Sequence, residues 1–281
     1  MSTPTEPAVE PTATARAEAS PLFAENVTIK FGGLVAVNDV TFVIPPKSVV
    51  SLIGPNGAGK TTFFNILTGL YQPTSGYVEL GGVDVTGRPP HKIAQLGLAR
   101  TFQNIRLFNL MTAEENVMVA MHSHLKSGIV GTVLRIPRQR REEREAREVA
   151  AELLDYVGIP KTRHEYARNL SYGDQRRLEV ARALALRPKV LLLDEPTAGM
   201  NPQESRVFTD FVHRIRDEKN LSVLLIEHDM SVVMRVSERI TVLDRGEVIA
   251  EGGPDEIRTN TRVVEAYLGK SGTEQAGGAR S

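Results

Sequence analysis

Cysteine is absent from this chain of 281 residues, and so is an excess of charge of either sign. Without cysteine, neither a disulfide framework nor a thiolate metal site can form, which fits a reducing compartment. Lys and Arg number 34, as do Asp and Glu, and a formal net charge of +0 gives no electrostatic reason to expect a nucleic-acid partner.

Long apolar runs are also absent from the sequence. None approaches the roughly 18 to 20 residues that a membrane-spanning helix needs. The first residues lack the basic and apolar regions of a secretory signal. We therefore expect a chain that is soluble by itself and most simply cytoplasmic.

Both ends of the sequence differ in composition from its centre. The first residues are rich in Pro, Thr, Ala and Glu, and too poor in large apolar side chains to fold, which predicts a disordered leader over residues 1–22. A similar composition predicts a flexible tail over residues 269–281. Residues 23–268 are long enough for one large domain with a small subdomain.

The stretch GPNGAGKTT matches the pattern G-x-x-x-x-G-K-[ST]. A β-branched run, VVSLI, precedes it, and FFNILTGL follows with helical spacing. Strand, glycine-rich turn and helix start predict a phosphate cradle, because glycines let successive N–H groups point at one anion and the helix adds its positive end. A glycine-rich turn that merely precedes a lysine would lack these flanks. The predicted nucleotide contacts are Gly54, Pro55, Asn56, Gly57, Ala58, Gly59, Lys60, Thr61 and Thr62, with Lys60 on the outer phosphates and Thr61 on Mg²⁺.

Two adjacent carboxylates end the apolar run VLLLDEP. Asp194 stands at the tip of the predicted strand, where it could bind Mg²⁺. Glu195 points elsewhere, toward the place where an attacking water could sit. Either carboxylate alone could be a strand-end cap or a surface charge. In a chain with a phosphate loop, the pair favours a catalytic interpretation.

A third motif, LSYGDQRRLEVARAL, places Ser171 and Gly173 at the start of a helix. Alone it indicates only a well-capped helix. His228 ends the buried run LSVLLIEHD, as a residue that senses the γ-phosphate would. His122 and His124 do not face each other on a helix, so we interpret them as surface residues rather than a metal pair, and His213 as structural.

With these pieces in this order, the chain from Phe23 to Leu268 resembles the ATP-binding subunits of ABC transporters. The resemblance implies that Phe31 stacks on adenine. It places Gln103, in TFQN, at the Q-loop glutamine, which takes part in catalysis and binds Mg²⁺. LSYGD stands at the signature LSGGQ, AGMN at the D-loop, and His228 at the switch histidine.

The fold class that follows is α/β, a P-loop NTPase cassette of the ABC type with a mixed sheet core. The early runs NVTIKF and VAVNDVTFVI predict an antiparallel β layer. Helical spacing in the middle predicts a helical subdomain over about 104–186, in which Thr112 and Glu115 form a capping box and Glu143 pairs with Arg147. Strands and helices alternate in the last third, as a parallel sheet needs.

Three positions depart from the family pattern. Tyr172 and Asp174 replace a glycine and the glutamine of LSGGQ, whereas Ser171 and Gly173 keep the groups that would contact phosphate. Asn201 stands where the D-loop has aspartate, which removes a charge at the expected subunit interface.

More narrowly, the segments FGGLVAVNDV, ARTFQNIRLF, LIEHDM and AYLG look like the corresponding segments of the ATPases of branched-chain amino acid importers. The resemblance implies two ATPase subunits, the second a related but different chain, that sandwich ATP head to tail. It also implies two transmembrane permease subunits, an external solute-binding protein and a peripheral place on the cytoplasmic face of the inner membrane. A urea importer and an export or lipopolysaccharide-extraction ATPase are the alternatives.

Two other classes of ATPase use the same cassette. Chromosome-associated and DNA-repair ATPases insert long coiled coils, for which the spacing between Lys60 and Ser171 leaves no room. Translation-associated ATPases usually carry two cassettes, whereas this chain has one.

Overall fold

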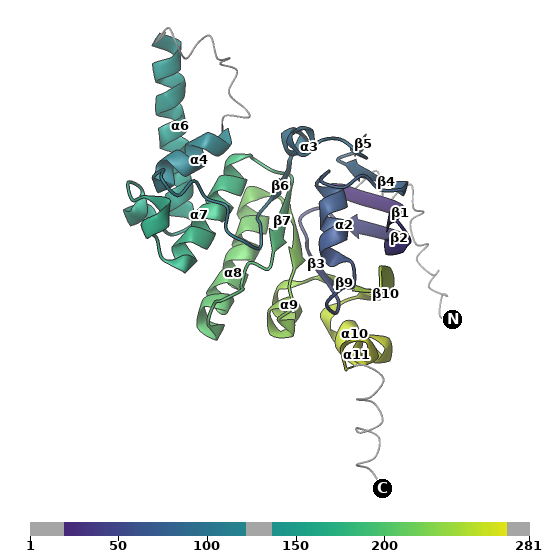
Figure 1. The fold of residues 1–281 in the computed structure, drawn as a ribbon. Coiled ribbons are helices and arrows are strands. Elements are labelled where there is room, and N and C mark those ends of the chain that lie inside the picture. Colours follow the sequence, from purple (N-terminus) through teal and green to yellow (C-terminus); the bar gives the residue numbers. More distant parts are fainter. Residues whose placement is uncertain (1–19, 122–136, 269–281) are drawn as a thin grey trace, which may run out of the picture.

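A six-stranded sheet in the order β10-β9-β3-β8-β7-β6 forms the centre of the computed structural model, which describes residues 20–121 and 137–268 (Figure 1). Its strands are β3 (Val49–Ile53), β6 (Leu98–Arg100), β7 (Val190–Asp194), β8 (Ser222–Ile226), β9 (Arg239–Asp244) and β10 (Glu247–Gly252). β10 pairs antiparallel with β9, while the other pairs are parallel. The mixed sheet core is therefore confirmed.

A second, antiparallel sheet has the order β2-β1-β4-β5. It contains β1 (Leu22–Phe31), β2 (Leu34–Ile44), β4 (Ser75–Leu80) and β5 (Val83–Asp84). Leu22 pairs with Ile44 and Leu80 and is fully buried. The expected leader over residues 1–22 therefore ends one residue too late, because Leu22 is already the first residue of β1 and pairs with the strands on both sides.

Helix α2 (Lys60–Leu67) packs in the apolar core between the two sheets. Side chains of β7 point alternately to the two faces of the central sheet. Val190 and Leu192 join the core around α2, whereas Leu191 and Leu193 join the core with α8 (Pro202–Lys219). The period of two explains why the strand reads as a continuous apolar run: it is covered by helices on each side.

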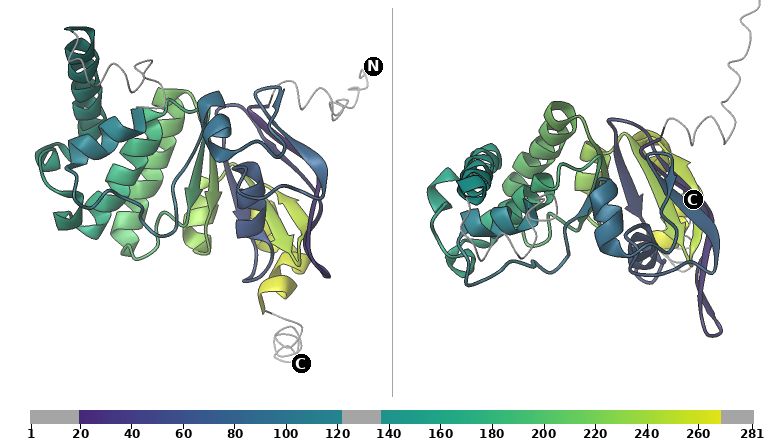
Figure 2. Two further views of the ribbon diagram at one scale, coloured as in Figure 1. Left: turned by 45° about the horizontal axis from the view of Figure 1, so that its top comes forward. Right: turned by 90° about the horizontal axis from the view of Figure 1, so that it is seen from above.

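Three helices form a lobe beside the central sheet, drawn in teal in Figure 1 and seen from two further directions in Figure 2. They are α4 (Ala113–Met121), α6 (Pro137–Tyr156) and α7 (Tyr172–Ala185). At the start of α4, Thr112 N–H donates to Glu115 at 2.8 Å and Glu115 N–H donates to the Thr112 hydroxyl at 3.2 Å, the expected capping box. Arg147 contacts Glu143 at 2.9 Å, also as expected. His122 and His124 lie outside the described residues.

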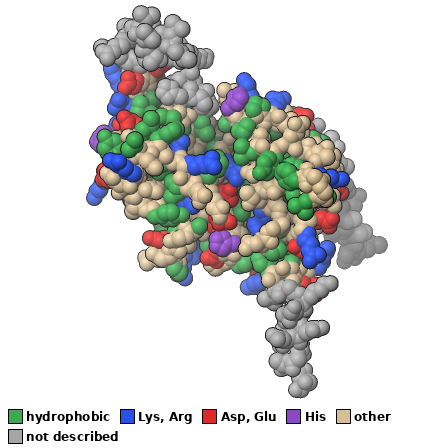
Figure 3. Space-filling model, viewed as in Figure 1, with side chains coloured by type: hydrophobic (Ala, Val, Ile, Leu, Met, Phe, Trp, Pro, Cys, Tyr) green, Lys and Arg blue, Asp and Glu red, His purple; other side chains and the backbone are tan. Residues whose placement is uncertain are grey.

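The remaining helices are short: α3 (Pro90–Leu96), α9 (Met230–Val236), α10 (Pro254–Thr259) and α11 (Thr261–Leu268). Across residues 20–121 and 137–268, we find no helix with the length and apolar character needed to cross a membrane. Figure 3 shows that acidic and basic side chains are interspersed on the face seen in Figure 1, rather than gathered by sign.

Register places the carboxyl ends of four strands at one edge of the central sheet. Ile226 of β8 lies beside Leu52 of β3 and Asp194 of β7, and Arg100 of β6 lies beside Leu192. In open α/β sheets, ligands bind outside this edge. The four loops that leave these strands carry the motifs described above.

We predict that Phe42→Ala lowers the free energy of unfolding by about 3 to 5 kcal/mol, because it empties a site in the core. The Phe42 ring is buried edge to face on Phe63 of α2, with centroids 5.6 Å apart. Leu110→Ala is the control, since Leu110 is 73% exposed and should change stability by less than about 0.5 kcal/mol. Urea unfolding measures both, and equal losses would contradict the packing described.

Candidate functional site

The loop from Gly54 to Thr62 connects β3 to α2 in a conformation that requires glycine. Gly59 is the N-cap of α2 and has a φ of 99°. A Cβ atom there would lie 2.5 Å from the backbone oxygen of Ala36, so no side chain fits. No side chain caps α2, and its first N–H groups are therefore available to an anion.

Backbone groups from two other segments hold this loop in place. The N–H of Gly246, in the β9–β10 turn, donates to the oxygen of Ala58 at 3.0 Å. The oxygen of Gly246 in turn accepts from Asn38 N–H of β2 at 2.8 Å. Helix α11 also reaches the loop: burial raises the pKa of the Tyr267 hydroxyl, and a hydrogen bond from the Gly54 backbone opposes that rise. We had not singled out Tyr267 from the sequence.

Lys60, the first residue of α2, folds over the loop. Its Nζ donates to the backbone oxygens of Gly54 at 2.7 Å and Pro55 at 2.9 Å. Burial lowers the pKa of Lys60, while the negative charge of Glu195 opposes that shift. The predicted phosphate-binding lysine and the predicted catalytic carboxylate therefore share one electrostatic environment.

Three predicted residues from separate loops meet at the Glu195 carboxylate. Gln103 Nε2 donates to Glu195 Oε2 at 2.8 Å, and His228 Nδ1 lies 3.8 Å from the same oxygen. Glu195 has a φ of 46°, a left-handed value that is uncommon outside glycine. This sharp turn directs Glu195 away from Asp194, as the sequence predicted for adjacent carboxylates.

Asp194 is held by a residue that we did not predict. Arg100, at the end of β6, places Nη2 2.7 Å from Asp194 Oδ2, and both side chains are largely buried. Arg100 Nη1 donates to Asn65 Oδ1 of α2 at 2.8 Å. One guanidinium thus ties the end of β7 to the phosphate helix. An arginine at the end of a short apolar run was the only signal in the sequence.

Glu227 is a second residue that the sequence analysis missed. It is buried and accepts from the backbone N–H of Thr197 at 3.0 Å and from the Thr197 hydroxyl. The N–H of His228 also donates to it, at 3.1 Å. Glu227 therefore links the segment after Glu195 to the segment that carries His228. A carboxylate inside the run LIEHD was its signal.

Phe31 is the last residue of β1, in the β1–β2 hairpin, and Ala36 of the same hairpin lies against the phosphate loop. The Phe31 side chain is 46% exposed, and its ring packs edge to face against Tyr71 at 5.4 Å. The exposed Phe31 ring is itself a flat apolar surface suited to a nucleobase. Tyr71 packs against it at 74° and so supports the ring without sharing its plane.

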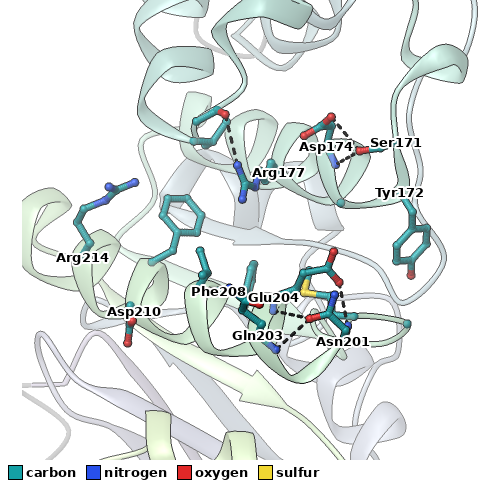
Figure 4. A pocket seen from close by; sticks show the side chains of 17 residues that line it. Ser171, Tyr172, Asp174, Arg177, Asn201, Gln203, Glu204, Phe208, Asp210 and Arg214 are labelled. Atoms are coloured by element: carbon teal, nitrogen blue, oxygen red, sulfur yellow. Dashed lines mark hydrogen bonds between the residues drawn. The ribbon is translucent and has the colours of Figure 1, made fainter.

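Ser171 and Gly173 open onto a different space, a groove of about 1020 Å³. Ser171 is the N-cap of α7 and hydrogen-bonds with Asp174, while Asn201 faces it across the groove (Figure 4). None of the loop residues from Gly54 to Thr62 lines the groove. Within one chain, then, the predicted signature and the predicted phosphate loop do not form a single site.

Asn201, which departs from the family pattern, has a clear local role. Its Oδ1 accepts from Gln203 N–H and Glu204 N–H, both at 2.9 Å, and its own N–H donates to Glu204. The residue is the N-cap of α8 in a complete capping box. The amide thus performs the capping that an aspartate would, without the charge.

Comparison with known proteins identifies relatives over most of the chain. A family model described as ABC transporter matches residues 37–198, and one described as branched-chain amino acid ATP-binding cassette transporter matches residues 247–273. BraF of Pseudomonas aeruginosa, a high-affinity branched-chain amino acid transport ATP-binding protein, is 50% identical over 89% of this chain and 98% of its own. LivG of Escherichia coli, of the same description, is 47% identical over 89% and 99%.

Solved structures show the same fold. The ADP conformation of MJ1267, an ATP-binding cassette of an ABC transporter, superposes with a TM-score of 0.77 at 28% identity. The match covers 89% of this chain and 99% of that one.

Substitution of two loop glycines should separate the cost of backbone conformation from that of a clash. Both Gly57 and Gly59 have positive φ, so alanine strains both by roughly 1 to 2 kcal/mol. A Cβ at Gly57 meets nothing within 4 Å, whereas one at Gly59 meets Ala36. We expect Gly59→Ala to weaken binding of a fluorescent ATP analogue and lower stability well beyond Gly57→Ala. Equal effects would contradict the close packing of the loop.

Proposed function

Because this chain belongs to the ABC transporter ATP-binding family, we propose that it is the ATPase subunit of an importer for branched-chain or other neutral amino acids. Members of the family hydrolyse ATP to power transport. The observation that carries the catalytic part of the proposal is the convergence of Gln103 and His228 on the Glu195 carboxylate, next to Lys60.

In this proposal, each residue at the strand edge has a distinct task. Glu195 accepts a hydrogen bond from the attacking water and polarises it. Lys60 offsets the negative charge of the outer phosphates, while His228 contacts the γ-phosphate and holds the water in line. Gln103 orients Glu195 through the 2.8 Å hydrogen bond and reports the nucleotide state to membrane partners.

The loop from Gly54 to Thr62 suits the phosphates of ATP, since it combines a glycine turn, a lysine and an uncapped helix start. Thr61, Gln103 and Asp194 offer the hydroxyl, amide and carboxylate oxygens that Mg²⁺ prefers. When bound, Mg²⁺ would neutralise charge on the β- and γ-phosphate oxygens. No cluster of three His, Cys, Asp or Glu side chains suited to a metal occurs in the described part of the chain, so the phosphates would complete the ligand set. Phe31 would stack on adenine, with Tyr71 packed against the Phe31 ring.

The separation of the groove from the phosphate loop supports a two-subunit site. In our proposal, ATP on the loop of one subunit is closed by Ser171 and Gly173 of another. Contacts to the γ-phosphate stabilise the closed dimer, and hydrolysis releases it. The second ATPase would be a related but different chain. This pair would bind two permease subunits from the cytoplasmic face, with an external binding protein that delivers the solute.

Glu195→Gln should retain ATP binding and lower turnover by at least about 10²-fold, because the amide cannot accept a proton. It should also trap a closed dimer in ATP, visible by light scattering. Glu143→Gln is the matched control, since Glu143 is an exposed carboxylate on α6 that pairs only with its helix neighbour Arg147 in the contacts described. Wild-type turnover in Glu195→Gln would remove that residue from the mechanism.

Uptake measurements test the proposed solute. Proteoliposomes that enclose ATP and contain the complex with its co-purifying membrane subunits should take up labelled leucine when the solute-binding protein is supplied outside, and the Glu195→Gln complex should not. Neutral amino acids and urea serve as comparison solutes. Uptake of urea alone, or of none of the three, would overturn the amino-acid assignment and leave the ATPase proposal standing, and co-purifying export or lipopolysaccharide-extraction subunits would favour that alternative.

A further inference from the structure

Tyr172, which replaces a glycine of the family signature, lies between two functional loops. A Cβ atom at Gly199, in the D-loop segment, would be 3.4 Å from Tyr172 Cε1, so the ring lies within the reach of one added carbon, and both residues line the groove. The Tyr172 hydroxyl accepts a hydrogen bond from Arg176 Nη2 at 3.0 Å. The Arg176 guanidinium also lies 5.4 Å from the ring centroid. A glycine at this position could make none of these contacts.

Arg176, one turn further along α7, holds the loop that carries Gln103. The residue is 3% exposed. Its Nη1 donates to the backbone oxygen of Phe102 at 2.7 Å, and its Nη2 donates to the backbone oxygen of Gln103 at 2.5 Å. Two nitrogens of one planar group therefore fix two successive carbonyls, a geometry that lysine cannot reproduce.

Glu179 completes this network from the next turn of α7. It contacts Arg176 Nη1 at 3.2 Å and accepts from Phe102 N–H at 3.0 Å. Burial raises the pKa of Glu179, while its hydrogen bonds and Arg176 oppose the rise. The helix thus engages both backbone groups of Phe102, directly before Gln103. Charged groups buried this deeply are costly to disturb singly, so the connection is stiff.

We propose that Tyr172 and Arg176 are positioning residues that couple the D-loop at Gly199 to Gln103 and thereby to Glu195. The Tyr172 ring lies beside Gly199, and three hydrogen bonds lead on from it: from Arg176 to the Tyr172 hydroxyl, from Arg176 to the Gln103 backbone, and from the Gln103 amide to Glu195. The inference rests on the proposed roles of Gln103 and Glu195. A displacement of the D-loop or of the start of α7 by a partner subunit would reach the catalytic carboxylate through Tyr172 and these three hydrogen bonds.

Three variants in the reconstituted complex test the coupling. Tyr172→Phe keeps the ring and removes the hydroxyl, and should lower kcat by about two- to tenfold. Arg176→Lys keeps the charge but loses the planar group that binds both carbonyls, and should lower kcat by about tenfold or more. Affinity for ATP should stay within about twofold in both, since neither residue contacts the phosphate loop. Arg187→Lys, at an exposed residue two positions beyond the end of α7, is the matched control and should leave kcat unchanged.

A double-mutant cycle separates coupling from simple structural support. If Arg176 acts through Gln103, adding Arg176→Lys to Gln103→Ala should cause little further loss of kcat, whereas independent effects multiply. The coupling would be overturned if the losses of kcat in the two single variants multiply in the double variant. It would also be overturned if the loss of kcat in each variant simply follows its midpoint of thermal unfolding. If Arg176→Lys fails to fold, the same cycle with Tyr172→Phe decides. Failure of Glu195→Gln to lose turnover would instead refute the proposed function, so the two failures are distinguishable.

Discussion

Parallel alignment of β3, β8, β7 and β6 is the constraint on which the rest of this molecule depends. Because their carboxyl ends fall at one edge, the phosphate loop, His228, Glu195 and Gln103 emerge side by side. A slip of one residue in β7 would turn its apolar faces over and carry both carboxylates away from the loop. The two apolar cores on either side of the sheet set this register, so the stability of the core and the geometry of the site have the same origin.

Buried charged side chains then fix the positions of the loops that the sheet brings close together. Arg100 secures the end of β7 to α2, Glu227 joins the segments after β7 and β8, and Arg176 joins α7 to the segment after β6. Each of these groups is costly to leave unpaired in a dry interior. Alternative arrangements of the loops are therefore disfavoured, and these charged side chains have a structural role rather than a catalytic one.

Much of the molecule could be predicted from its sequence because the relevant rules are local. The phosphate loop, the capping box at Thr112 and the alternation of strands and helices depend on neighbouring residues. Arg100, Glu227 and Tyr71 were missed because their partners are distant in the chain, and no periodicity marks such pairs. The leader boundary was placed one residue late, since burial of Leu22 depends on β2 and β4. Roles for single site residues stay predictions, although the structure brings Gln103, Glu195 and His228 together.

The contacts that support the phosphate loop have a consequence for how this chain can diverge. Ala36, Leu243 and Gly246 meet the loop through main-chain atoms, at least in the contacts that lie closest to its glycines. Exchange of the partly exposed Ala36 side chain would leave its backbone oxygen in place, whereas an insertion or deletion in either hairpin would shift the supporting atoms. The loop itself therefore requires its glycines, whereas the hairpins that support it must above all keep their length. We therefore expect related sequences to vary at exposed positions around the nucleotide but to keep the lengths of both hairpins.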